Sequence, residues 1–211
     1  MAELPEIIPL FPLPNAVLFP KMALPLHIFE PRYRKMVADV WGSHRTLGMM
    51  LLKPGWEPEY QGRPPVYAIG CAGRMERHEP LPDGRSNILM RGISRFRVLQ
   101  EHAGEPYRLA SVEELPDLAD DAEPGLAHAR KKVLAAVARA SDGPSTLVMQ
   151  PELPHDVFVN ALAQSMDLTP VERQSLLDCD RVLARYQRLL EILEFKALEA
   201  AYGRSGGDKV H

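Results

Sequence analysis

Residues 9–40, PLFPLPNAVLFPKMALPLHIFEPRYRKMVADV, constrain the fold of this chain more than any other stretch. The stretch opens as an apolar run broken by prolines. Because proline fixes φ and lacks a backbone N–H, the run suits an edge or starting strand. From Ala23 to Phe29, alternating side chains predict a strand with one buried face. Glu30-Pro31 then begins a predicted helix, since an early helical proline loses no hydrogen bond. Its apolar stripe is Tyr33, Met36, Val37, Val40 and Trp41.

Short strands dominate the next part of the chain. They are predicted at residues 46–53, 66–75, 87–91, 95–99 and 107–112. The Pro82-Asp83-Gly84 turn joins two of them in a hairpin, and Gly92 is expected to permit a sharp bend. Residues 53–65 hold four prolines and two glycines, so they form a predicted loop, which carries Trp56 and Tyr60. These elements predict a small, partly closed barrel.

Helices are predicted after an acidic linker at 113–124. Two of them span 126–140 and 154–166, and a third begins at a capping box, Thr169-Pro-Val-Glu172. A last helix is expected to begin near Asp178 and to run past Glu191. Its apolar stripe is interpreted as a face of the helical bundle, with a homodimer interface as the alternative. The stripe consists of Leu183, Tyr186, Leu190, Leu193, Ala197 and Ala200. The predicted class is α+β, with a β-rich barrel over 1–116, a helical bundle over 117–202 and a flexible tail over 203–211.

Composition narrows the function classes. The 211 residues carry a formal net charge of −3, whereas nucleic-acid binders are more often basic. Cys71 and Cys179 make neither a metal spacing nor a disulfide framework, and no histidine has a second ligand at helical or hairpin spacing. We therefore expect no metal and no cofactor. Without a secretory signal or an apolar run of membrane-spanning length, a cytoplasmic protein with no membrane contact is expected.

Three separated segments carry a resemblance to a known family. They are residues 9–36, from PLFPL through VLFP to LPLHIFEPRYRKM; residues 67–98, YAIGCAGRMERHEPLPDGRSNILMRGISRFRV; and residues 167–193, DLTPVERQSLLDCDRVLARYQRLLEIL. From about Ile8 to Ala200, the chain resembles the N-terminal, substrate-binding domain of the Lon protease family. The resemblance implies a PUA-like β pseudobarrel followed by a C-terminal helical bundle. Lon continues into an ATPase module and a Ser-Lys peptidase, so the resemblance implies the stand-alone bacterial form, which is not an enzyme.

Apparent catalytic motifs do not support an enzyme. Asp142-Gly-Pro-Ser145 is similar to the segment around the Lon catalytic serine, but no lysine follows before Lys196 on a predicted helix. Residues 203–209 have the composition of a P-loop without its GK[ST] ending, preceding strand and following helix. The charged residues near the first helix are interpreted as structural ion pairs rather than acid–base groups: Glu30, Arg32, Arg34 and Arg95.

The preferred function is a non-catalytic module that binds unfolded or partner polypeptides, with a protease or chaperone among its partners. An RNA-binding PUA-like module and a hydrolase with an unrecognised site remain the alternatives. Capture of unfolded chains needs exposed apolar groups. The candidates are large apolar residues in turns and loops: Phe19, Met22, Trp56 and Tyr60. The competing interpretation is that these four residues cap the open end of the barrel.

Overall fold

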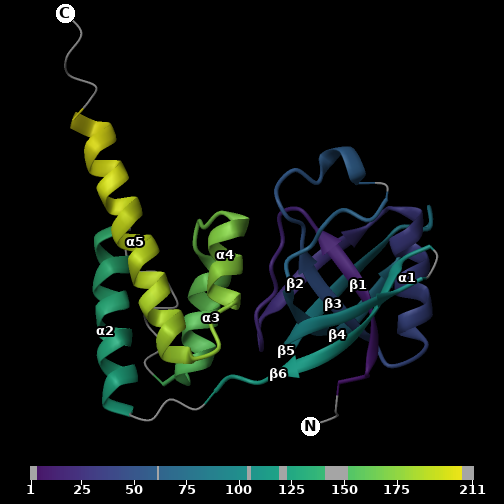
Figure 1. Ribbon diagram of the computed structural model, residues 1–211, viewed down its shortest axis with the longest axis horizontal. Coiled ribbons are helices and arrows are strands. Elements are labelled where there is room, and N and C mark those ends of the chain that lie inside the picture. The colour runs from purple at the N-terminus through teal and green to yellow at the C-terminus, as the bar shows by residue number, and fades with distance from the viewer. Residues whose placement is uncertain (1–3, 61, 104–105, 119–122, 141–151, 206–211) are drawn as a thin grey trace, which may run out of the picture.

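The computed structural model describes residues 4–60, 62–103, 106–118, 123–140 and 152–205. Strands and one helix form one part of the molecule, and four helices form the other part beside it (Figure 1). The strands are β1 (Ile7–Leu13), β2 (Ala23–Ile28), β3 (Thr46–Leu51), β4 (Ile69–Pro80), β5 (Ser86–His102) and β6 (Arg108–Leu115). The helices are α1 (Pro31–Trp41), the 3₁₀ turn η1 (Glu57–Glu59), α2 (Glu123–Ala140), α3 (His155–Ser165), α4 (Pro170–Leu177) and α5 (Val182–Ser205). The expected α+β class is confirmed.

The sheet closes on itself. Its strand order is β2-β5-β4-β3-β1-β6, and β6 also pairs with β5, which closes a ring of strands and leaves β2 at an edge. Within the described residues, these strands pair antiparallel to one another except for β1 and β3, which are parallel. The expected barrel, mainly antiparallel, is therefore present. Its first strand is not an edge strand, because β1 is paired on both sides, by β3 and β6.

The strand-to-helix passage from β2 to α1 follows the sequence pattern. Along β2, Ala23, Pro25 and His27 are exposed, and the residues between them are buried or half-buried. Helix α1 has proline at its first position and buries the predicted stripe of Tyr33, Met36, Val37 and Val40, with Trp41 half-buried. This passage places Glu30 and Arg32 at the start of α1.

β4 and β5 form a long hairpin, and here one expectation was wrong. The segments predicted at 87–91 and 95–99 are a single strand, β5, which continues through Gly92. A Cβ atom at Gly92 would lie 2.0 Å from the backbone oxygen of Phe19. Gly92 is thus needed for close approach of the 19–22 turn, to which it is tied by hydrogen bonds from Lys21 N to Gly92 O and from Gly92 N to Met22 O, both 2.9 Å.

The helical part contains the predicted capping box. Thr169 N donates to Glu172 Oε2 at 2.6 Å, and Glu172 N donates to Thr169 Oγ1 at 3.2 Å. The last helix begins at Val182 rather than near Asp178. Its fully buried face includes Leu189 and Ile192, which the predicted stripe omitted, whereas the predicted Ala197 and Ala200 are exposed. The other helices therefore bury a wider face of α5 than the predicted stripe, which followed a single line of three- and four-residue spacings.

The buried apolar side chains of the described residues form two clusters. The smaller one draws side chains from all five strands of the ring and fills its interior: Ile8, Leu10, Met50, Ala72, Phe96, Ala110 and Val112. The larger one contains strand residues such as Met49 and Cys71 together with helix residues such as Leu176 and Leu189. Because this cluster is continuous across the two parts, they are packed together rather than joined only by a linker. Among the described residues, no helix is long and apolar enough to cross a membrane.

Candidate functional site

The 53–65 loop forms a compact cover at one end of the barrel (Figure 1). A hydrogen bond from Lys53 N to Pro65 O, 2.9 Å long, and the bridge between Leu52 and Val66 close its base. Gly55 adopts φ +84°, a left-handed conformation that suits glycine, and the η1 turn follows it. Trp56 therefore lies just before, and Tyr60 just after, a short helical turn.

Side chains from α1 hold the loop in place. Arg32 Nη1 donates to the backbone oxygen of Tyr60 at 3.1 Å, and Arg32 also pairs with Glu30 through Nη2 at 3.0 Å. The Tyr60 hydroxyl donates to Glu30 Oε1. The Arg32 guanidinium lies 4.6 Å from the ring centroid of Tyr33 and 4.9 Å from that of Tyr60. Arg32 is thus stacked between two aromatic rings and bonded to both α1 and the loop.

Trp56 and Tyr60 form an aromatic pair at the surface. Their ring centroids are 5.1 Å apart with the ring planes at 61°, an edge-on contact. Both residues are half-buried. Among the described residues, neither belongs to the apolar side chains that pack on the two core clusters. The pair therefore retains aromatic surface that the core does not use.

A pocket of about 150 Å³ lies beside this loop. Its wall contains the arginines Arg32, Arg63 and Arg108, the tyrosines Tyr33, Tyr60 and Tyr107, and the apolar residues Pro12, Leu52, Pro64 and Pro106. We call it the arginine pocket, after Arg32, Arg63 and Arg108. Its residues come from β1, α1, the 53–65 loop and the start of β6, so only the closed barrel brings them together.

The buried arginine of this pocket is firmly held. Arg108 Nη1 donates to Pro64 O at 2.8 Å, and the guanidinium forms a two-point ion pair with the Glu101 carboxylate. Arg63, which is exposed, donates from Nη1 to His102 O at 3.2 Å. The arginines thus attach the loop to α1, β5 and β6 and fix the shape of the pocket.

Burial keeps the tyrosines of the pocket neutral. Burial raises the pKa of Tyr33 far above its usual value, and burial with the hydrogen bond to Asp39 raises the pKa of Tyr107 to about 12. Burial alone would lower the pKa of Arg32, but the nearby Tyr33 and Glu30 more than offset it, and the net pKa is raised. Neither the tyrosines nor the arginine changes protonation near neutral pH.

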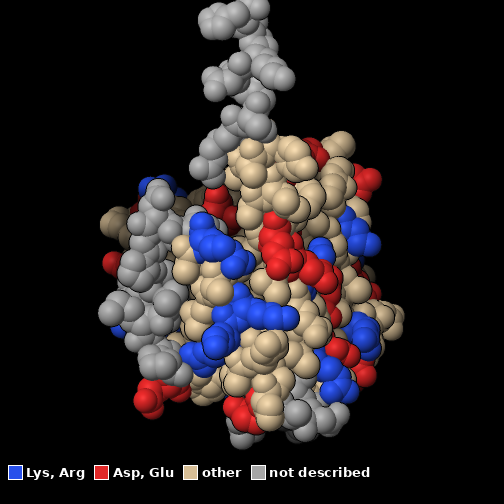
Figure 2. Space-filling model, turned by 90° about the vertical axis from the view of Figure 1, so that its left-hand side faces the viewer, with Lys and Arg blue, Asp and Glu red and all other residues tan. Residues whose placement is uncertain are grey.

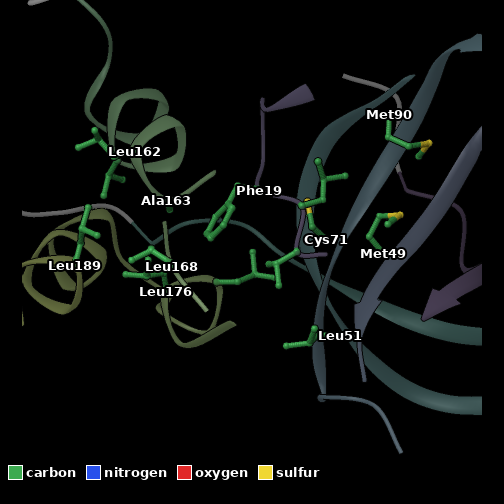
Figure 3. Close-up of a cluster of buried hydrophobic side chains, with 14 of the residues drawn as sticks. Phe19, Met49, Leu51, Cys71, Met90, Leu162, Ala163, Leu168, Leu176 and Leu189 are labelled. Atoms are coloured by element: carbon green, nitrogen blue, oxygen red, sulfur yellow. The ribbon is translucent and has the colours of Figure 1, made fainter. Parts of the chain in front are cut away.

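The structure separates the four predicted binding residues into two places. Phe19 is fully buried, which contradicts its expected exposure. Figure 3 shows its ring between the strands and the helices, pointing toward Ala163, Leu168 and Leu176. Helix α3 covers the turn, with Asn160 Nδ2 donating to Pro20 O at 3.1 Å. Met22 is half-buried on this turn, apart from the loop that carries Trp56 and Tyr60.

Of the residues predicted to form structural ion pairs, Glu30 and Arg32 pair with each other, and Arg95 pairs with a carboxylate other than the expected one. Glu30 pairs with Arg32 at the start of α1. Arg95 is fully buried but pairs with Asp117, at 3.1 Å, rather than with the carboxylate at the helix start. The pattern of charges near α1 indicated pairing correctly, but Asp117 lies in the linker after β6 and could not be singled out by sequence.

The described residues offer no cluster of side chains for a metal site. Within them, no group of three His, Cys, Asp or Glu side chains could hold a metal ion. Lys196 lies on α5, with its Nζ 3.4 Å from Glu172 Oε2. The segment around Ser145 lies outside the described residues.

Figure 2 shows the face formed by α2 and α5, where a basic cluster lies beside acidic side chains rather than forming an uninterrupted stripe.

Sequence reasoning missed Tyr33, Arg63, Tyr107 and Arg108 as pocket residues. Tyr33 was correctly predicted to be buried, but its ring was assigned only to the helix stripe. Arg63 lies in the same loop as Tyr60, so the sequence could have indicated it as a cationic candidate beside the predicted aromatic residues. Arg108 follows a predicted strand start, and no local pattern connects it with Arg32. Only the closure of the ring through β5 and β6 supplies that connection.

Known proteins with a similar sequence belong to one family. The family described as the ATP-dependent protease La (LON) substrate-binding domain matches residues 7–194. The chain is 25% identical to a Lon protease of Cytophaga hutchinsonii over 99% of its own length and 26% of that protein. It is 26% identical to a Lon protease of Flavobacterium johnsoniae over 93% of its length and 24% of that protein. The chain thus spans about a quarter of the length of these relatives.

Solved structures agree with the fold. A Lon N-terminal domain protein from Xanthomonas campestris superposes with a TM-score of 0.65 and 27% identity, covering 88% of this chain and 97% of that one. The N-terminal domain of Mycobacterium avium complex Lon protease gives a TM-score of 0.69 at 16% identity, covering 89% and 98%. At 16% identity the second likeness concerns the fold alone.

Proposed function

The chain belongs to the family of the Lon substrate-binding domain, and from this premise we propose that it binds polypeptides, either unfolded chains or segments of partner proteins, without acting on them chemically. The observation that carries the proposal is the Trp56–Tyr60 pair, two half-buried aromatic rings that the core does not use. Of the two, Tyr60 also lines the arginine pocket. Burial of apolar surface is the main attraction that does not depend on the sequence bound. Such a pair therefore suits a ligand of variable sequence.

The rigidity of the loop supports this proposal. Tryptophan and tyrosine have few rotatable bonds, so they supply contact area at a low cost in conformational entropy. The contacts of Arg32 to Tyr60 O and Tyr60 to Glu30 order the loop before a ligand arrives. Pre-organisation lowers the entropic cost of binding. Met22 stays a predicted contact on a separate turn, and Phe19 is withdrawn from the binding surface because it is buried.

The proposed partners follow from the family. A Lon-type protease or a chaperone would receive the captured polypeptide, and a homodimer remains part of the proposal. We place this activity in the cytoplasm, which fits two cysteines that are both free. RNA binding is the weaker alternative, because the chain carries a net charge of −3.

Equilibrium binding tests the proposal. A fluorescently labelled model protein would be prepared folded and, by reduction and carboxymethylation, permanently unfolded, and each form would be titrated with the full chain. We expect saturable binding of the unfolded form and much weaker binding of the folded form. A labelled single-stranded RNA provides the competing arm. Binding of the RNA in preference to the unfolded protein would contradict the proposal and favour the alternative.

A further inference from the structure

The free edge of β2 suggests how a polypeptide is held. We infer that an extended segment of the bound chain pairs with this edge and adds a strand to the sheet, through hydrogen bonds between main-chain groups. This inference rests on the proposed function and deepens it, because it names the part of a polypeptide that is recognised. Main-chain groups are common to all sequences, so strand addition suits a ligand of variable sequence. The support comes from the pairing, the composition and the position of β2.

β2 is hydrogen-bonded to a strand on one side only. It lies at the end of the strand order and pairs with β5, and among the described residues no strand pairs with its other side. It packs mainly on β5 and makes no comparable contact with another described element. Figure 1 shows β2 at the margin of the strand part. An edge of this kind presents a row of main-chain N–H and C=O groups to an incoming strand.

The bonds to β5 show which main-chain groups of β2 are available. Gly92 N donates to Met22 O at 2.9 Å, so the carbonyl of Met22 faces β5. In an antiparallel pair such as β2 and β5, main-chain groups alternate between the two sides of the strand. Ala23, Pro25 and His27 therefore point theirs outward. Because Pro25 has no N–H, the outward donors are the N–H groups of Ala23 and His27, and the outward acceptors are all three carbonyls.

The composition of β2 leaves this edge open to a partner. Natural edge strands are commonly protected by charged side chains, by bulges or by proline. β2 has the sequence ALPLHI, without a lysine, arginine, aspartate or glutamate, and its register with β5 runs without a shift. Pro25 removes one donor from the middle of the edge but keeps its carbonyl. A partner is thereby limited to a short strand, which is bonded mainly at Ala23 and His27.

The position of β2 connects the two places where predicted binding residues lie. Met22 directly precedes the strand, and Glu30, which accepts the hydrogen bond of the Tyr60 hydroxyl, lies two residues beyond its end. At about 3.4 Å per residue, a strand as long as β2 spans about 20 Å. A ligand strand on this edge therefore runs from the Met22 turn toward the Trp56–Tyr60 pair. Phe29, which is 60% exposed, lies along this path and offers apolar contact.

Methylation of peptide nitrogens tests the pairing on the full chain. Three labelled peptides share one sequence that alternates leucine and threonine: the first is unmodified, the second is N-methylated at the leucines, and the third at the threonines. Each modified peptide thus loses the N–H groups of one edge only. We expect one of them to bind at least about tenfold more weakly than the unmodified peptide, and the other to bind about equally well.

The outcomes separate this inference from the proposed function. Equal affinities, or equal losses, for the two modified peptides would overturn the inference and leave the proposed function standing. An unmodified peptide that does not bind would also overturn the inference. An unfolded model protein that does not bind would overturn the proposed function as well.

Two substitutions at one position tie the pairing to β2. His27→Pro removes an outward N–H and keeps the main-chain bonds to β5, whereas His27→Ala keeps that N–H and removes the same imidazole, whose Nδ1 lies 2.8 Å from Asn87 Oδ1. We expect His27→Pro to bind the unfolded model protein about fivefold more weakly and His27→Ala to bind it as wild type does. Circular dichroism checks that both variants are folded, and the methylated peptides decide the question on wild type if His27→Pro is not.

Equal affinities of the two folded variants would overturn the assignment to this edge. A second copy of the chain is the other possible occupant. A wild-type dimer that His27→Pro converts to a monomer without loss of polypeptide binding, measured by sedimentation, would assign the edge to that copy and overturn the inference.

Discussion

Arg185 of α5 donates two hydrogen bonds to the Asp117 carboxylate, from Nη2 to Oδ1 at 2.8 Å and from Nη1 to Oδ2 at 3.3 Å. Arg95 of β5 donates to the same Oδ1 from the barrel side, at 3.1 Å. Both arginines are buried, and Arg185 has no exposed surface. One carboxylate in the linker after β6 therefore joins the strand and helical parts. This junction adds a polar connection to the apolar cluster that packs the two parts together.

Removal of the junction carboxylate should destabilise the whole molecule. Asp117→Ala would leave Arg95 and Arg185 buried without their counter-ion, which costs about 3–5 kcal/mol when a buried pair is broken. Urea unfolding should show that loss in the free energy of unfolding. Glu113→Ala serves as the control, because its exposed pair with Arg97 should contribute less than about 1 kcal/mol. Equal stability of the two variants would show that the junction does not depend on Asp117.

Gly92 should tolerate no side chain. In Gly92→Ala the new Cβ would lie 2.0 Å from Phe19 O, so the 19–22 turn or β5 must move. Overpacking of this kind costs about 1–3 kcal/mol, and the melting temperature should fall by several degrees. Gly42→Ala is the comparison, because its Cβ would meet nothing closer than 3.9 Å. A Gly92→Ala protein as stable as the Gly42→Ala protein would contradict the close approach.

The capping box of α4 should make stability depend on acidity. Burial raises the pKa of Glu172, but the hydrogen bonds from Thr169 and the charge of Lys196 lower it, and the net pKa is below its usual value. The stabilising effect is therefore complete above the unfolded pKa of about 4.3 and is lost as pH falls through the lower folded pKa. Glu172→Ala should cost about 1 kcal/mol at pH 7, and the difference from wild type should shrink as pH falls below about 4.3 and through the folded pKa of Glu172. A constant difference across this range, measured by urea unfolding, would contradict the ionised cap.

We also predict that the purified chain neither hydrolyses ATP nor cleaves unfolded casein. The physical reason is that the sequence lacks the motifs for both reactions, and Lys196 is engaged with Glu172 on α5. Ser145→Ala should leave the melting temperature and polypeptide binding unchanged. Peptidase activity that disappears in this variant alone would overturn the non-catalytic assignment.

Local patterns in the sequence predicted much of the fold. The capping box at Thr169 and Glu172 was predictable because its hydrogen bonds lie within four residues. The β2–α1 passage was predictable because its alternation and its proline act locally. Gly92 was recognised as special, but the reason was misjudged, since the backbone that approaches it belongs to the distant 19–22 turn.

The site was less predictable because distant segments form it. Trp56 and Tyr60 could be named from loop composition, yet Arg32 and Arg108 meet only once the ring of strands has closed. Phe19 was placed in a turn correctly, but a turn is buried when another element covers it, as α3 does through Asn160 and Pro20. Burial of loop and turn residues is therefore decided by tertiary packing, which a single sequence does not reveal.

The central claim, that the Trp56–Tyr60 surface binds polypeptide, is tested most directly by one dissociation constant. The Kd of the full chain for an unfolded model protein should be measured for wild type and Trp56→Ala, with Phe195→Ala as control because Phe195 is 59% exposed on α5, away from the site. Hot-spot aromatics contribute about 2 kcal/mol or more, so Trp56→Ala should weaken binding about thirtyfold with little change in melting temperature, while Phe195→Ala binds as wild type does. An unchanged Kd in Trp56→Ala, with a melting temperature several degrees lower, would show that the ring only caps the barrel and would contradict the claim.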